Sequence, residues 1–284
     1  MILTTALSTQ AVERGPTEQD TYRLVWSDEF DVDGKPDPQK WNYEQGFVRN
    51  HELQWYQPEN AFCENGKLLI EGRREHKPNP DYQENSSSWK QQRKNIDYTA
   101  SSLTTRGLHA WQYGRFEVKA RIAAKNGLWP AIWFLGQDGN WPENGEIDLM
   151  EYYQGQILAN ACWGGKPKSD GGRLAEWDSV KKSVRAWGDP AWDQKFHVWR
   201  MDWDQTSISL YLDDELLNAI DLSKTLNHEG CALRNPFHQP FYLLLNLAIG
   251  GDNGGDPSDT AFPTRYEVDY VRVYQRTSFD APAK

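Results

Sequence analysis

Cysteine is scarce in this sequence. Only three of its 284 residues are cysteines, Cys63, Cys162 and Cys231, and none of them lies at CxxC spacing. Thiols placed in this way provide neither the disulfide framework of a small secreted domain nor a zinc site. The six histidines also lack the HxxxH spacing of a metal-binding helix. We therefore expect no cofactor to take part in catalysis.

Positive charge and long hydrophobic stretches are lacking as well. The 31 lysines and arginines are outnumbered by 41 aspartates and glutamates, which gives a net charge of −10. Because proteins bind phosphate backbones largely through Lys and Arg, this balance argues against a nucleic-acid partner. No stretch approaches the roughly 18 uninterrupted apolar residues of a membrane-spanning helix. The composition favours a neutral ligand and predicts no membrane span.

Aromatic residues, in contrast, are abundant. The chain contains 14 tryptophans, 13 tyrosines and 10 phenylalanines. Tryptophan is too large for one core to hide so many, so we expect several rings to be partly exposed, where flat amphipathic faces stack on ligands such as sugars. The remainder would fill the core and its rim.

Short runs with β-strand composition recur between turn signals along most of the chain, and no segment has the length and periodicity of a convincing helix. This spacing predicts an all-β sandwich or barrel. The clearest examples are 68–71, 114–122, 207–212 and 266–274.

The chain shows no change of composition that would mark a second domain and no internal repeat. We therefore predict one domain over 21–276, preceded by a polar leader at 1–20 and followed by a tail at 277–284. Two long polar segments, 74–97 and 164–190, are predicted as loops, and such loops in compact domains usually carry function or disorder.

The densest cluster of candidate catalytic groups is the segment 145–152, GEIDLMEY. On a regular strand Glu146 and Asp148 share one face, whereas Glu151 has the opposite parity. A β-bulge at the Leu-Met pair of this segment would return Glu151 to the face of Glu146, about 13 Å of backbone away. Side chains that lean together across that span leave carboxylates about 5 Å apart, as in a retaining glycosidase.

The chemistry of such a pair assigns different protonation states to its members. One glutamate must be ionised to attack the anomeric carbon, and the other must be protonated to release the leaving oxygen, so their pKa values have to differ. Asp148 lies between them and can hydrogen-bond the nucleophile. The spacing by itself fits a solvated acidic strand face or a calcium site equally well.

Two tryptophans precede the acidic segment, Trp129 and Trp133 in the run WPAIWF. Strand alternation places both rings on one face, and we expect their strand to lie beside the acidic one. Aromatic rings next to paired carboxylates favour a sugar-binding cleft. A buried core strand would show the same pattern.

These motifs together resemble glycoside hydrolase family 16, the laminarinase-like clan of β-jelly-roll enzymes. The resemblance implies a retaining endo-hydrolase with Glu146 as nucleophile, Asp148 as its helper and Glu151 as acid/base. It also implies a concanavalin-like jelly roll of two curved antiparallel sheets, with the cleft on the concave one. The matching segments are WSDEF at 26–30, NHELQWY at 50–56, YGRFE at 113–117, WPAIW at 129–133, EIDLME at 146–151, NLAIGG at 246–251 and VDYVRVY at 268–274.

Three segments depart from the family pattern. A Tyr-Thr pair is usually followed by Ser-Gly-Arg, but here 98–102 reads YTASS and the next arginine is Arg106. A histidine common on the strand after the catalytic one is replaced by NACW at 160–163, and the Gly-Gly turn continues as DNGGD at 252–256 instead of Asn-Trp. We expect these changes at sugar subsites, where they bear on the substrate and leave hydrolysis untouched.

Substrate contacts are expected from two groups of residues. We predict that Trp129, Trp133 and Trp163 stack on sugar rings. Asn50 and Asn246 are added as polar contacts because the resemblance implies them.

The resemblance also implies a structural calcium ion away from the cleft. The matching positions are Glu29, the carbonyl of Gly66, and Asp269. Calcium prefers carboxylate and carbonyl oxygens, and it would join the start of the domain to its last strand.

The predicted function is therefore an endo-hydrolase of a polysaccharide, with β-1,3-glucan or mixed-linkage β-glucan as first substrate. The alternatives are an endo-β-galactanase acting on agar, porphyran, carrageenan or keratan-type chains, a transglycosylase, and a sugar-binding jelly roll without catalysis. We expect a monomer that is secreted, periplasmic or on the cell surface. The first eleven residues resemble the apolar half of an export signal, although they lack its positive n-region.

Overall fold

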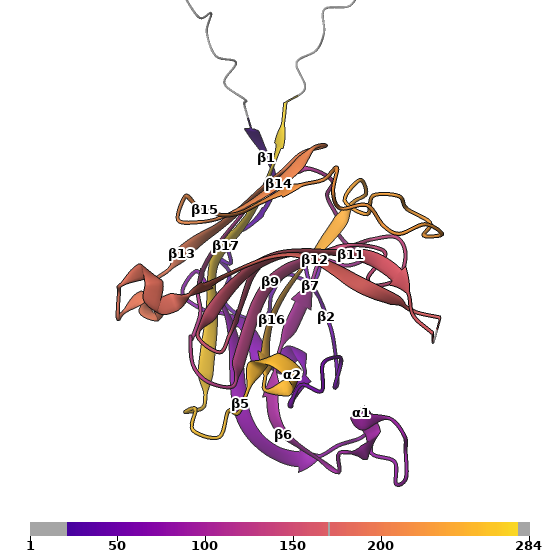
Figure 1. Cartoon of the computed structure of the whole chain (residues 1–284). Coiled ribbons are helices and arrows are strands. Elements are labelled where there is room, and N and C mark those ends of the chain that lie inside the picture. The colour runs from indigo at the N-terminus through magenta and orange to yellow at the C-terminus, as the bar shows by residue number, and fades with distance from the viewer. Residues whose placement is uncertain (1–21, 170, 278–284) are drawn as a thin grey trace, which may run out of the picture.

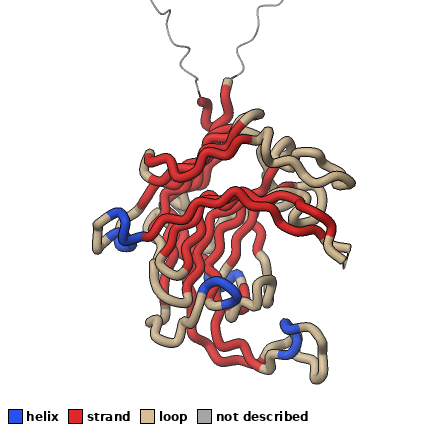
Figure 2. Tube along the Cα trace, viewed as in Figure 1, coloured by secondary structure: helices blue, strands red, loops and turns tan. Residues whose placement is uncertain are grey.

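The computed structural model describes residues 22–169 and 171–277. Two β-sheets account for most of this part of the chain, and the helical segments are short and peripheral (Figures 1 and 2). The predicted all-β sandwich is thus confirmed. The predicted leader, and all but the first residue of the predicted tail, lie outside the described residues.

One sheet has ten strands in the order β15-β14-β13-β8-β17-β5-β6-β3, with β1 paired to β17 and β4 to β5. All of its pairings are antiparallel except that of β3 with β6. Its strands are β1 (Tyr22–Asp28), β3 (Gln54–Tyr56), β4 (Ala61–Cys63), β5 (Leu68–Pro78), β6 (Asn95–Ala100), β8 (Gly114–Arg121), β13 (His197–Trp203), β14 (Ser207–Leu212), β15 (Glu215–Asp221) and β17 (Thr264–Arg276).

The other sheet has seven antiparallel strands in the order β12-β11-β10-β9-β16-β7-β2. These are β2 (Asn42–Tyr43), β7 (Ser102–Thr104), β9 (Leu128–Gly136), β10 (Glu146–Tyr153), β11 (Gln156–Pro167), β12 (Arg173–Ser183) and β16 (Phe241–Ile249). The helical segments are α1 (Trp89–Gln92), α2 (Gly251–Gly254) and the 3-10 turns η1 (Pro58–Asn60), η2 (Val184–Trp187) and η3 (Trp192–Gln194). No helix in the described ranges is both long and apolar enough to cross a membrane.

The core lies between the two sheets because each sheet turns alternate side chains toward the other. β8 and β13 bury every second residue, as expected for strands with one solvent-facing side. β9 and β16 are buried on both faces, which explains why their sequences are nearly continuous apolar runs. The outer face of these two strands is the floor of the cavity described below.

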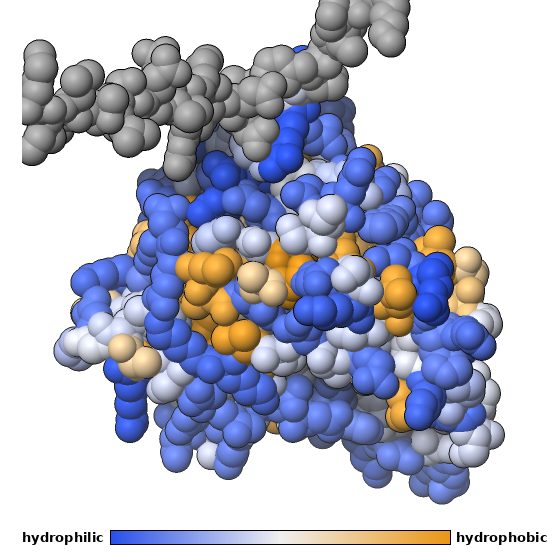
Figure 3. Space-filling model, turned by 45° about the horizontal axis from the view of Figure 1, so that its top comes forward, coloured by the Kyte–Doolittle hydropathy of each residue, from blue (hydrophilic) through white to orange (hydrophobic). Residues whose placement is uncertain are grey.

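The first and last described strands lie side by side. β1 pairs with β17 from Tyr22 opposite Arg276 to Asp28 opposite Val271. The described chain therefore begins and ends at the same end of the molecule (Figure 1). On the face shown in Figure 3, hydrophobic side chains gather in a band across a mostly hydrophilic surface.

Of the two segments predicted as loops, 74–97 keeps a loop between two strands, whereas 164–190 is largely strand. β5 continues to Pro78 and β6 begins at Asn95, so the first loop is shorter than predicted. Most of 164–190 belongs to the β11–β12 hairpin. β12 is an edge strand with much of its surface in solvent, and its polar composition therefore resembles that of a loop.

Candidate active site

A β-bulge in β10 brings the three acids of the GEIDLMEY segment to one face, as the parity argument predicts. On β9, Trp133 pairs with Asp148 and the next residue pairs with Met150, so one extra residue is inserted in β10. Leu149 and Met150 both face the core, whereas Glu151 returns to the outer face. The bulge is therefore the local feature that joins the second glutamate to the other two acids.

Gly145 shapes the entry into β10. Its φ is +80°, a conformation that L side chains rarely adopt, and a Cβ atom there would lie 2.9 Å from the Phe241 ring. A glycine at this position lets the chain turn tightly into the strand and present Glu146 as its first residue.

Glu146 receives a hydrogen bond from an exposed ring. Trp141, in the loop before β10, donates its indole N–H to Glu146 Oε2 at 2.5 Å. The Trp141 side chain is 51% exposed. The nucleophile candidate is thus held by a residue that also faces solvent.

Glu151 is held by residues of the sheet itself. Trp129 on β9 donates its indole N–H to Glu151 Oε1 at 2.9 Å. Asn160 on β11 donates from Nδ2 to Glu151 Oε2 at 3.1 Å and to Asp148 Oδ2 at 3.2 Å. Both carboxylate oxygens of Glu151 therefore accept bonds from neighbouring strands.

Burial raises the pKa of all three carboxyl groups. At Glu151 the charge of Glu146 adds to burial, and its pKa rises to about 7. At Glu146 the Trp141 N–H, a hydrogen bond with Asp148 and the charge of Arg49 oppose the effect of burial on the pKa. Burial and the charges of both glutamates raise the pKa of Asp148 well above its usual range. The charge of Glu146 thus raises the pKa of Glu151, whereas hydrogen bonds and a positive charge oppose the rise at Glu146, an asymmetry that suits a nucleophile paired with an acid.

Glu146 and Glu151 lie at a cavity of about 820 Å³ on the outer face of the seven-stranded sheet. This volume is within the usual range of ligand sites. Its lining comes from β9, β10, β11, β12 and β16, together with the loop 49–52, Trp141 and Asn253. The cavity thus crosses five adjacent strands, as a cleft for an extended chain requires.

Four predicted substrate residues line this cavity. Trp129 and Trp133 share a face of β9, next to β10 as predicted. Trp133 donates its N–H to Asn246 Oδ1 at 2.7 Å. Asn50 lies in the loop 49–52 and donates to a carboxylate oxygen of Glu52 at 3.4 Å.

The expectation for Trp163 is corrected by the strand register. Trp163 lies three residues after Asn160 on β11 and therefore points to the opposite face of the strand. It pairs with Glu176, and its ring packs against the core. Trp177 on β12 pairs with Cys162, lines the cavity and is 45% exposed. Since neighbours across strands share a face, Trp177 is the aromatic residue that β11 and β12 offer to a ligand.

Sequence reasoning missed several other lining residues. The Arg49 guanidinium lies 4.9 Å from the centre of the Trp133 ring and pairs with Glu44. Glu52 is only 2% exposed, and burial raises its pKa. Both are close in sequence to Asn50, so the NHELQWY motif was the available signal for them. Tyr153 follows Glu151 by two residues on β10, so strand alternation could have predicted that it shares the face of Glu151 and lines the cavity.

The three departures from the family pattern do not all reach the cavity. Asn160 and Asn253 line it. Arg106 instead lies 5.5 Å from the ring of Tyr242 beside another cavity, and Ser101 is fully buried. Two of the departures are therefore placed to affect substrate.

The residues predicted to hold calcium have cationic partners. Arg272 donates two hydrogen bonds to the Glu29 carboxylate, at 3.0 and 2.8 Å. Lys119 Nζ lies 2.7 Å from a carboxylate oxygen of Asp269. Within 22–169 and 171–277, no group of three or more His, Cys, Asp or Glu side chains is arranged to hold a metal. Both predicted carboxylate ligands are thus paired with basic side chains, and calcium binding at Glu29, Gly66 and Asp269 stays a prediction that chelation with a melting measurement checks.

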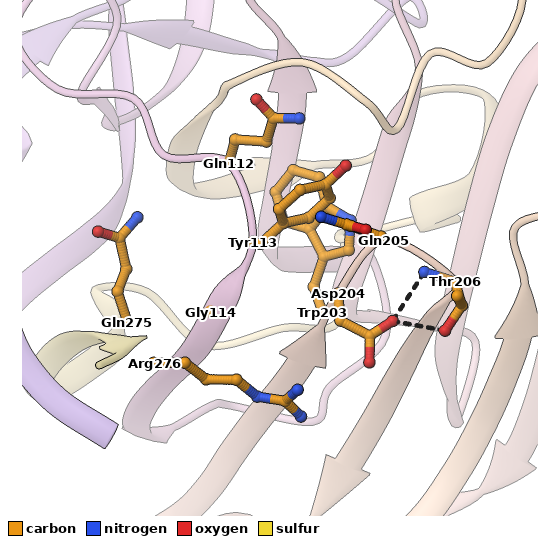
Figure 4. A pocket seen from close by; sticks show the side chains of 9 residues that line it. All are labelled: Gln112, Tyr113, Gly114, Trp203, Asp204, Gln205, Thr206, Gln275 and Arg276. Atoms are coloured by element: carbon orange, nitrogen blue, oxygen red, sulfur yellow. Dashed lines mark hydrogen bonds between the residues drawn. The ribbon is translucent and has the colours of Figure 1, made fainter. Parts of the chain in front are cut away.

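A second cavity, of about 470 Å³, lies at the end of the ten-stranded sheet (Figure 4). Tyr113, Trp203 and the side chains of three glutamines contribute to its lining. Asp204 is the one acid among its lining residues, and its Oδ1 accepts bonds from Thr206 and Ser207. No second carboxylate among the described residues lines this cavity beside Asp204. The paired carboxylates that a glycosidase needs are therefore found at the cavity on the β10 face.

Comparisons with known proteins relate the chain to glycoside hydrolases. A sequence model of glycosyl hydrolases family 16 matches residues 50–272. The β-glucanase of Rhodothermus marinus is 37% identical over 275 residues, covering 89% of this chain and 85% of that protein. The solved laminarinase of Rhodothermus marinus has a TM-score of 0.72 at 35% identity, covering 92% of this chain and 100% of that one.

A further solved structure comes from the endo-acting O-glycanases that prominent members of the human gut microbiota express to initiate mucin breakdown. Its TM-score is 0.80 at 33% identity, and the match covers 93% of this chain and 94% of that one. Together with the laminarinase structure, this likeness confirms the predicted jelly roll.

Proposed function

Because this chain belongs to glycosyl hydrolases family 16 and is a glycoside hydrolase, we propose that it cleaves internal β-linkages of a polysaccharide by a retaining double displacement. The bulge in β10 carries this proposal, since it returns Glu151 to the face of Glu146, where both glutamates line the cavity. The different surroundings of the two glutamates support their separate roles, because the charge of Glu146 raises the pKa of Glu151 while the Trp141 N–H and the charge of Arg49 oppose the rise at Glu146.

In the first step the ionised Glu146 attacks the anomeric carbon and forms a covalent glycosyl-enzyme, while Glu151 gives its proton to the leaving oxygen. In the second step Glu151, now ionised, takes a proton from water, and that water displaces Glu146 from the sugar. Asp148 hydrogen-bonds to Glu146 and stays protonated, so the proton that moves belongs to Glu151. The five-strand cavity supports binding of several sugar units on both sides of the cleaved bond.

Trapping the intermediate tests this mechanism. A 2-fluoro glycoside with an activated leaving group should add one sugar mass to the peptide that contains Glu146, and NMR of the first product should show the β-anomer. An α-anomer as first product, with no labelled peptide, would show an inverting mechanism and reject the proposal. A sugar-binding protein without catalysis would release no reducing ends from any polysaccharide.

For the substrate we propose β-1,3-glucan or mixed-linkage β-glucan. The 37% identity to a β-glucanase and the match to a laminarinase structure support this assignment. Incubation with laminarin and with mixed-linkage glucan, followed by chain-length analysis, should give a ladder of short oligosaccharides. Adding an acceptor oligosaccharide separates hydrolysis from transglycosylation, because only a transglycosylase extends the acceptor as its main reaction.

A second candidate substrate is a β-galactoside chain, of the agar, porphyran, carrageenan, keratan or mucin type. Two observations favour it: the TM-score of 0.80 to a structure from mucin-degrading O-glycanases, and the replacement of the usual histidine by the stretch 160–163 on a strand that lines the cavity. The same chain-length analysis on keratan sulfate, mucin O-glycans and red-algal galactans decides between the two. Cleavage of a galactan with laminarin left intact would reassign the substrate without affecting the mechanism.

We further propose that the protein acts outside the cytoplasm as a monomer. A polysaccharide is too large to cross a membrane freely, so an endo-acting enzyme meets it at the cell surface or beyond. Fractionation of the producing cells and light scattering of the purified protein test the two statements.

A further inference from the structure

Asn160 occupies a special place beside the bulge. It pairs directly with Asp148 across β10 and β11, and the next paired residue of β10 is Glu151, opposite Leu158. Because the bulge shifts the register here, a single side chain on β11 can reach both acids. Asn160 does so with one amide nitrogen, at 3.2 Å from Asp148 Oδ2 and 3.1 Å from Glu151 Oε2.

The orientation of the Asn160 carboxamide depends on those two acids. The side chain is only 3% exposed. Its Oδ1 is buried and has no hydrogen-bond partner within the described ranges. The contacts to Asp148 and Glu151 are therefore the polar contacts that fix this side chain, and the Asn160 amide in turn restrains both carboxylates.

We propose that Asn160 is a positioning residue for Glu151, which holds its carboxylate in the catalytic orientation and favours its ionised form. This inference rests on the acid/base role of Glu151 given above. A general acid that later acts as a base is ionised once its proton has left with the leaving group, and it must be held in that ionised form until it takes a proton from water. An N–H donor aimed at the carboxylate stabilises that ionised state, whereas it gives little to the protonated one.

The surroundings of Glu151 leave few other groups to perform this task. The Trp129 N–H takes the other oxygen of Glu151, and Leu158, its cross-strand neighbour, has no polar atom in its side chain. The titratable groups that interact with Glu151 are Glu146, Asp148 and Tyr153, all on β10. Further titratable or charged groups lie in the same cavity or beside the other two acids: Arg49 and Glu52 in the loop 49–52, Lys181 on β12 and Cys162 on β11. Of these, Glu146 contributes the largest charge effect and favours the protonated form of Glu151. Hydrogen bonds of Trp129, Asp148 and Asn160 oppose it, and Asn160 is the donor that β11 supplies.

Titration of Glu151 tests the proposal directly. The protein is labelled with ¹³C at the glutamate carboxyls, the Glu151 signal is assigned by its loss in Glu151→Gln, and the pKa is read by NMR. In Asn160→Ala the pKa of Glu151 should rise by about one unit, because a hydrogen bond to a charged group is lost. Asn160→Asp, which has the same size and adds a carboxylate, should raise it further.

The matched control is Asn218→Ala. Asn218 is also a buried asparagine that donates to two acceptors, the carbonyl of Ala159 on β11 and a carboxylate oxygen of Asp178, both at 3.0 Å. Its loss should lower thermal stability without moving the pKa of Glu151. If Asn160→Ala does not fold, the titration is read from Asn160→Leu, which keeps the size of the side chain and removes the N–H donor without adding a charge.

The pH dependence of kcat/KM supplies the functional readout. Its alkaline limb should move up by the same amount in the Asn160 variants and stay in place in Asn218→Ala. An unchanged Glu151 pKa in the folded Asn160 variants would overturn the proposal and leave Asn160 a packing residue. Failure of the proposed function is distinguishable, because it would appear as undiminished turnover in Glu151→Gln whatever the titration shows.

Discussion

The two ends of β10 hold their glutamates in different ways. At the first end, Glu146 accepts a bond from Trp141, a half-exposed residue of the preceding loop. At the other end, Glu151 accepts bonds from Trp129 and Asn160, both buried in neighbouring strands. Strand pairing fixes the two sheet donors, whereas the loop donor lies outside the sheet. The proposed acid/base, Glu151, is therefore held by the framework, and the proposed nucleophile, Glu146, by a loop.

Removing either carboxylate should have the largest effect. Glu146→Gln should abolish turnover, and Glu151→Gln should lower kcat by about 10²- to 10⁴-fold on natural substrate, because each change removes one half of the double displacement. Azide should rescue Glu151→Gln on a substrate with an activated leaving group, since that substrate needs no acid. Asp148→Asn should lose less than either, because Asp148 tunes protonation without forming a bond to sugar.

The control for these variants is Glu176→Gln, which removes a carboxylate of β12 that does not line the cavity. Near-normal activity in both Glu146→Gln and Glu151→Gln would refute the assignment of roles. Circular dichroism of each variant establishes that the fold is kept.

Deleting one indole N–H at each end should sharpen the comparison. Trp141→Phe should raise the pKa of Glu146 and move the acidic limb of the kcat/KM profile to higher pH. Trp129→Phe should raise the pKa of Glu151 and move the alkaline limb instead. Each shift should be about one pH unit, because each variant loses one donor to a carboxylate. Movement of the same limb in both variants would contradict the separation of the two ends.

Burial of Glu151 should also lower the free energy of unfolding at neutral and alkaline pH. Its pKa is about 7 in the folded protein against 4.5 for an ordinary glutamate, so the folded state binds more protons between these values and stability falls as pH rises through that window. At pH 8 the free energy of unfolding of Glu151→Gln should therefore exceed that of the native protein by about 1–3 kcal/mol. Urea denaturation measures this difference. At pH 4 the gain should vanish, because the carboxyl is then protonated in both states. A gain of equal size at both pH values would show a packing effect.

The smallest expected effects distinguish cavity rings from core rings. Trp177→Ala should weaken oligosaccharide binding by about 1–3 kcal/mol, as other lost stacking contacts do, with little change in melting temperature because the ring is half exposed. Trp163→Ala should lower the melting temperature and leave affinity nearly unchanged. Calorimetric titration of the inactive Glu146→Gln background measures the affinities. The reverse pattern would restore Trp163 to the substrate site.

The local sequence determined the catalytic strand almost completely. The parity of Glu146, Asp148 and Glu151 showed that only a bulge could bring all three to one face, and strand alternation placed Trp129 and Trp133 together. These are properties of neighbouring residues on one strand, so a period of two suffices to predict them.

Only the tertiary structure decided what surrounds that strand. The register of β11 against β12 turned Trp163 to the core and Trp177 to the cavity, and the register of β10 against β11 brought Asn160 to both acids. Arg272 and Lys119 reach Glu29 and Asp269 across pairings that one strand's sequence does not specify. The physical reason is that a shift of one residue in pairing exchanges the two faces of a strand, and this choice depends on contacts between residues far apart in the chain.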